Sequence, residues 1–62
     1  MNKSTLISVL WKMHTDQVIG NSELVHYLGS YDLHLVHVDA QYIEVSEIDV
    51  PSTVYKIAQL EK

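Results

Sequence analysis

The four histidines are the first residues of this chain that could support chemistry: His14, His26, His34 and His37. Neutral imidazole is a common metal ligand in proteins. Residues three apart on a strand point to opposite faces, so only His37 and Asp39 could share one side of a strand. Structural metal sites normally need four well-placed ligands. We therefore expect hydrogen-bonded or surface histidines and no bound metal.

The sequence carries no motif for nucleophilic catalysis or phosphate binding. It has no Gly-x-Ser-x-Gly elbow, no glycine-rich loop among its two glycines and no His-Glu-x-x-His pair. Sixty-two residues also leave little room for a cleft that excludes water. We expect no enzyme activity and no cofactor.

The acidic charge is concentrated in one segment. Eight acids against four lysines, without any arginine, give a net charge of −4, and residues 31–50 hold five acids without one basic residue. Nucleic-acid affinity comes largely from Lys and Arg displacing counterions, so this segment should repel a phosphate backbone. A partner protein with a basic surface fits the charge better.

Aromatic residues are enriched at binding hot spots, and Tyr31 and Tyr42 stand at the two ends of the acidic segment. Trp11 lies on a helix whose apolar arc is wider than that of an ordinary surface helix. Together with the acids, these aromatics form our set of candidate partner-binding residues: Trp11, Tyr31, Asp32, Asp39, Tyr42, Glu44, Glu47 and Asp49.

Two helices should precede the acidic segment. Apolar residues at i, i+3, i+4 and i+7 from Leu6 predict a helix over about 5–16, capped by Ser4 or Thr5. A turn at Gly20-Asn21 should lead into a short helix over 23–28, capped by Asn21 or Ser22 and stopped by Gly29.

The acidic segment itself predicts a β-hairpin. A four-residue loop over 39–42 pairs Val38 with Ile43 and places His37 opposite Glu44. The same register is expected to align three further pairs: Val36 with Val45, Leu33 with Ile48 and His34 with Glu47. Each half contains a slip in its two-residue period, which indicates a bulge or a ribbon that is partly covered on both faces.

The last element is predicted to be a helix. Pro51 ends the hairpin, and Val54, Ile57 and Ala58 recur at helical spacing from Ser52 to about Leu60. The β-branched residues of the segment 53–57 also suit a third strand, which is the alternative.

These elements predict one small α+β domain over residues 1–62, in the order α-α-β-β-α, with an antiparallel hairpin packed on helices. The chain has no cysteine, its apolar run from Leu6 to Trp11 ends at Lys12 without a cleavage site, and no run is long enough to span a membrane. We expect a soluble, cytoplasmic protein that is not stabilised by disulfides.

Residues 5–29 resemble the opening helices of helix-turn-helix domains, with the hairpin where a wing would stand. The resemblance covers less than half of the chain and implies a DNA-binding regulator. A recognition helix is missing after Gly29, and arginine, the usual reader of guanine, is absent.

The function that the sequence favours is stoichiometric protein binding, as an acidic regulator, inhibitor or adaptor that blocks a basic surface on a larger protein. A helix-turn-helix-like DNA-binding protein is the alternative, and a structural homodimer is the second alternative because self-association would also cover surplus apolar surface.

Overall fold

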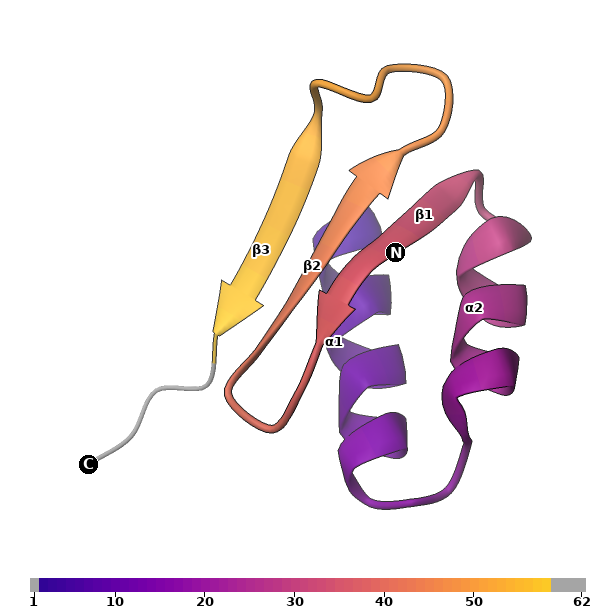
Figure 1. Cartoon of the computed structure of the whole chain (residues 1–62), viewed down its shortest axis with the longest axis vertical. Helices are drawn as coiled ribbons and strands as arrows, with labels where there is room; N and C mark the ends of the chain where they lie inside the picture. Colours follow the sequence, from indigo (N-terminus) through magenta and orange to yellow (C-terminus); the bar gives the residue numbers. More distant parts are fainter. Residues whose placement is uncertain (1, 59–62) are drawn as a thin grey trace.

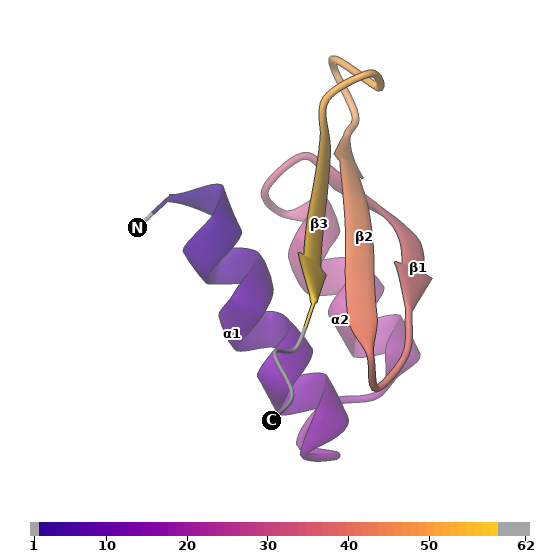
Figure 2. The same cartoon turned by 90° about the vertical axis from the view of Figure 1, so that its left-hand side faces the viewer.

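Two helices pack on one face of a three-stranded antiparallel sheet, as Figures 1 and 2 show for a computed structural model of the chain. The structure describes residues 2–58. The elements, in chain order, are α1 (Lys3–Thr15), α2 (Asn21–Gly29), β1 (Leu33–Val38), β2 (Tyr42–Glu47) and β3 (Val54–Ala58). The predicted α+β class is confirmed, and the sheet order is β1-β2-β3. Neither helix within residues 2–58 is long and apolar enough to cross a membrane.

Helix α1 begins two residues earlier than predicted because Asn2 is its N-cap. The Asn2 side-chain oxygen accepts a hydrogen bond from the Thr5 amide at 2.8 Å, which satisfies one of the free donors of the first turn. The prediction that Ser4 or Thr5 caps the helix is therefore wrong. The buried face of α1 carries Ile7, Leu10 and Trp11.

Helix α2 follows Gly20, and not Asn21 or Ser22, as its N-cap. The Gly20 amide donates to the Glu23 carboxylate at 2.9 Å, which holds the first turn. Gly29 is the last helical residue and does not take a left-handed conformation. Asp32 takes it instead, with φ of 61°, so the chain reverses three residues later than predicted.

The hairpin register is confirmed at the turn and wrong farther from it. Val38 pairs with Ile43 and His37 with Glu44, as predicted. Beyond them the pairs are Leu35 with Val45, His34 with Ser46 and Leu33 with Glu47. The ladder shifts between Leu35 and His37, so Val36 is the extra residue of a bulge.

This bulge places all the apolar residues of the hairpin that belong to the core on one face. Because Val36 adds one residue, Leu33, Leu35 and Val38 all face the helices, although an unbroken two-residue period would put Val38 on the face opposite to Leu33 and Leu35. Ile48 lies beyond the end of β2, so its apparent slip belongs to a loop and not to the strand.

The segment after Pro51 is a strand, so the predicted terminal helix over 52–60 is wrong within the described residues and the alternative, a third strand, is confirmed there; positions 59–60 lie outside them. β3 pairs with β2 from Tyr42–Ala58 to Ser46–Val54. Tyr55 and Ile57 pack against the core, and Val54, Lys56 and Ala58 alternate with them on the exposed side. Burial alternates along β3 with a period of two residues, as in a strand, although the spacing of Val54, Ile57 and Ala58 would also fit a helix.

One apolar core joins the helices to the sheet. It contains Ile7, Leu10, Trp11, Ile19, Leu24, Leu28, Leu33, Ile43 and Val45. The helices cover only this side of the sheet (Figure 2). We call the other side the open face, and it carries His34, Val36, His37, Tyr42, Glu44, Ser46, Val54, Lys56 and Ala58.

Candidate protein-binding surfaces

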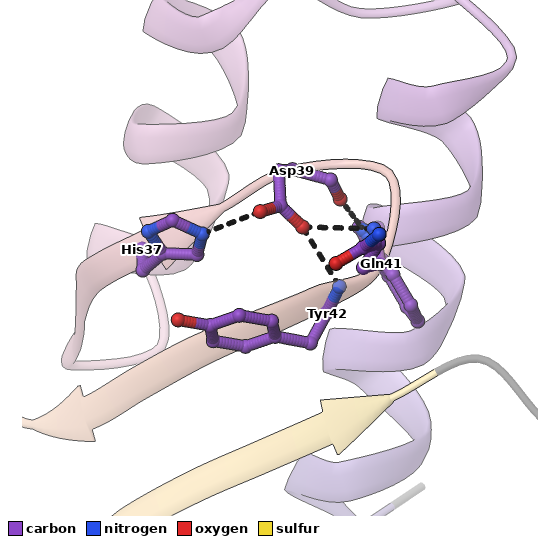
Figure 3. A network of polar contacts seen from close by, with 5 residues as sticks. His37, Asp39, Gln41 and Tyr42 are labelled. Atoms are coloured by element: carbon purple, nitrogen blue, oxygen red, sulfur yellow. Dashed lines mark hydrogen bonds and ion pairs between the residues drawn. The ribbon is translucent and has the colours of Figure 1, made fainter.

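The turn between β1 and β2 is held by the side chain of Asp39 (Figure 3). One carboxylate oxygen accepts the amides of Gln41 and Tyr42 at 2.8 and 2.9 Å, and the other lies 2.8 Å from His37 Nε2. The hydrogen bond from His37, helped by the two amides, lowers the pKa of Asp39 to about 2. Asp39 is therefore an ionised acceptor that fixes the turn.

Trp11 connects this turn to α1. Its indole Nε1 donates to the backbone oxygen of Asp39 at 2.9 Å. The Trp11 side chain is only 8% exposed, so the ring belongs mainly to the core and offers little area to a partner. The backbone amide of Tyr42 uses the Asp39 side chain, which leaves the Asp39 carbonyl free to accept from the indole.

A row of stacked side chains crosses the open face near the same turn. The rings of His37 and Tyr42 stack with centroids 4.4 Å apart, and Lys56 Nζ lies 4.7 Å from the centroid of the Tyr42 ring. Glu44 pairs with His37 on one side and with Lys56 on the other in the strand register. Charges of both signs therefore meet on this face.

Glu47 lies on the helix side of the sheet, between α1 and β3. It accepts from Tyr55 Oη at 2.6 Å and from Lys3 Nζ at 3.1 Å. These two bonds lower the pKa of Glu47, and the bond to Glu47 raises the pKa of both Lys3 and Tyr55. Glu47 therefore connects β2 with α1 and β3, and each of its carboxylate oxygens already accepts a hydrogen bond.

Two loops meet at the end of the sheet where β1 begins and β2 ends (Figure 1). This end lies opposite the turn that Asp39 holds. The Ile48 amide donates to the Asp32 carbonyl at 3.0 Å, which joins the loops. We call this surface the acidic end, formed by Tyr31, Asp32, Ile48, Asp49 and Val50. The side chains of Tyr31, Ile48 and Val50 are 49%, 52% and 49% exposed. The segments 30–32 and 48–53 contain no basic residue.

The structure brings together three of the eight candidate residues and separates the rest. Tyr31, Asp32 and Asp49 share the acidic end. Tyr42 and Glu44 lie on the open face, Asp39 lies in the turn, and Trp11 and Glu47 lie on the helix side, at positions set by the pairing and contacts above.

Ile48, Val50 and Lys56 are surface residues that the sequence reasoning did not select. The sequence places Ile48 and Val50 in the predicted hairpin, where one face of each strand is covered. It places Lys56 in the predicted terminal helix. The signal that could have identified the first two is Pro51, because a proline limits how far β2 can extend.

Histidines do not assemble a metal centre in the part of the chain that the structure describes, where no group of three or more His, Asp or Glu side chains could hold an ion. His37 and Asp39, the one pair that the sequence placed on the same side of a strand, hydrogen bond to each other. His14 contacts the side chain of Asn21, and the ring of His26 packs edge-on against Tyr27.

Comparison of the chain with protein-family models, with curated proteins and with solved structures yields no match.

Proposed function

We propose that this protein is a stoichiometric binding module that attaches to a basic surface of a larger protein and thereby regulates, inhibits or recruits it. The observation that carries the proposal is the acidic end, where the half-exposed Tyr31, Ile48 and Val50 are chain neighbours of Asp32 or Asp49 in two loops that a backbone hydrogen bond joins. Apolar side chains supply the area that a partner can bury, and the carboxylates select a partner of opposite charge.

Charge around the acidic end supports a protein partner over nucleic acid. The nearby lysine, Lys3, is bonded to Glu47 and also lies within the electrostatic influence of Asp32. A phosphate backbone would meet carboxylates here, whereas Lys and Arg side chains of a protein would be attracted. The setting we propose is the cytoplasm, which suits a chain without cysteine.

The experiment that tests this proposal compares two doubly neutralised variants in quantitative affinity capture. Asp32→Asn with Asp49→Asn removes both charges of the acidic end, and asparagine tolerates the positive φ at position 32. Asp16→Asn with Glu44→Gln removes the same charge elsewhere on the surface. We expect a partner that the wild type and the second variant capture equally and that the first loses by about tenfold or more.

Purified chain should first be shown to unfold at the same denaturant concentration in all three forms, so that a loss of capture reports binding. An equal loss of captured partner in both variants would show that capture depends on the net charge of the protein and not on the acidic end. Retention of every captured protein by the first variant would refute the role of the acidic end.

A further inference from the structure

The outer edge of β3 is open. β3 lies at the end of the sheet and pairs only with β2 among the strands of residues 2–58. Figure 2 looks along the sheet onto this edge, with α1 beside it. An uncovered edge strand presents unpaired amide and carbonyl groups that another strand can bind.

The register identifies which backbone groups point outward. The Glu47 amide donates to the Thr53 carbonyl at 3.0 Å, so residue 53 faces β2. Antiparallel pairs alternate between bonded and non-bonded positions. Val54, Lys56 and Ala58 therefore direct their amide and carbonyl groups away from β2, toward the open edge.

Tyr55 and Ile57 of β3 pack against the core on the helix side of the sheet, where α1 lies (Figure 2). A strand added to β3 would place alternate side chains on that side, beside Tyr55 and Ile57.

The charges beside the edge select the occupant. Lys12 and Lys56 lie on α1 and β3, whereas Lys3, at the start of α1, is already bonded to Glu47. Lys12 Nζ is 3.4 Å from the Asp16 carboxylate, but both side chains are more than half exposed, so this pair can exchange partners at little cost. Lys56 Nζ lies over the Tyr42 ring. An incoming segment with a carboxylate would meet opposite charge.

A second copy of the chain fits this edge poorly. An antiparallel β3–β3 pair that uses all five residues places Lys56 directly opposite the Lys56 of the other copy. Like charges directly opposite each other destabilise a sheet, and a lysine on an edge strand is a common means of preventing self-pairing.

We propose that the outer edge of β3 binds an extended acidic segment of another protein by strand addition, with its apolar side chains on the helix side and a carboxylate near Lys56. The edge runs from Val54, which follows the loop of the acidic end, to Ala58 at the other end of the sheet, and its proposed role does not depend on the acidic end. With two surfaces of opposite charge preference, the protein could bridge two partners.

The test uses the full chain and a displayed library of random ten-residue peptides as the probe. We expect enriched peptides with apolar residues at alternate positions and at least one Asp or Glu. Bound peptide should slow the exchange of the amide protons of Val54, Lys56 and Ala58.

Two substitutions separate the backbone from the charge. Lys56→Pro removes an outward amide without removing a bond to β2, and should weaken the enriched peptides by at least about tenfold. Lys56→Glu keeps the backbone amide, so it should still bind extended peptides but should lose about two- to fivefold in affinity for acidic ones and enrich basic ones.

The unfolding midpoints of both variants serve as the folding control, and Lys56→Glu keeps the test valid if the proline variant does not fold. The proposal is overturned if no peptide is enriched above bare support, if Lys56→Pro binds as tightly as the wild type, or if exchange slows only outside β3. A concentration-dependent dimer that Lys56→Pro abolishes would assign the edge to a second copy and would also overturn it.

Discussion

Asp39 shows how one short side chain can organise a turn that lacks glycine. Its carboxylate takes the amides of the next turn residues and the imidazole of His37, while its carbonyl accepts the indole of Trp11. Asp39 therefore connects the turn to β1 through His37 and to α1 through Trp11. The sequence predicts the position of the loop, but it does not predict that Trp11 uses its indole to hold the turn, because this contact joins residues 28 positions apart.

Asp39 should make stability depend on pH in the acid range. Its pKa is lowered from 3.8 to about 2, so its contribution is complete above pH 3.8 and is lost as the pH falls through about 2. Asp39→Asn keeps an oxygen for the two amides but removes the ionised partner of His37. We expect the urea midpoint of the wild type to exceed that of the variant at pH 5.

This difference should shrink steadily between pH 4 and pH 2 when both proteins are followed by circular dichroism. A difference that stays constant over this range, or grows as the pH falls, would contradict the role given to the carboxylate.

At the scale of elements, the sequence predicts the helices and strand pairs that depend on residues close to one another in the chain. The helical spacing in α1 and the alternation near the hairpin turn are local patterns, and they predict both helices and the Val38–Ile43 pair correctly. The bulge at Val36 was foreseen only as one of two explanations for the slip. Its position depends on which residues the helices cover, and that is a property of the assembled core.

β3 was predicted only as the alternative to a terminal helix, for a related reason. Val54, Ile57 and Ala58 fit a helix, whereas Tyr55 and Ile57 fit a half-buried strand. The choice is made by β2, whose outer side offers a ladder of hydrogen bonds to the segment. The spacing of residues within a five-residue segment does not show whether a neighbouring strand is available to pair with it.

Helix α2 offers a direct test of its observed boundaries. Gly29 is helical without a positive φ, and a Cβ added there would meet no atom within 4 Å. Gly29→Ala should therefore raise the free energy of unfolding by about 0.4–1 kcal/mol, because alanine restricts the unfolded chain.

Gly20→Ala is the matched control, since Gly20 is the N-cap, where alanine is disfavoured, and it should cost roughly 0.5 kcal/mol. Urea unfolding measures both. A loss of stability in Gly29→Ala would mean that Gly29 is the left-handed stop predicted from the sequence.

At the scale of the whole molecule, the fold separates residues that the sequence groups together. The acidic segment 31–50 is continuous in sequence, yet its charges are divided among the acidic end, the open face, the turn and the contact with α1. Composition alone therefore identifies an acidic protein but not the acidic end. The acidic end could not be predicted because it joins two loops, one on each side of the hairpin.

The lysines show the complementary arrangement. Within residues 2–58 they lie on α1 and β3, away from the acidic end except for Lys3, which Glu47 holds. A molecule with this distribution can attract partners of opposite charge to different surfaces. We propose that the acidic end is one of these surfaces.

The most direct measurement is site-specific photo-crosslinking in the native lysate, with the same photoreactive residue placed at Ile48 or at Val25. The two side chains are 52% and 51% exposed, and Val25 lies on α2, outside the acidic end. We predict a discrete cross-linked protein from position 48 only, which weakens as salt is raised. No adduct from position 48, or the same adduct from position 25, would contradict the account.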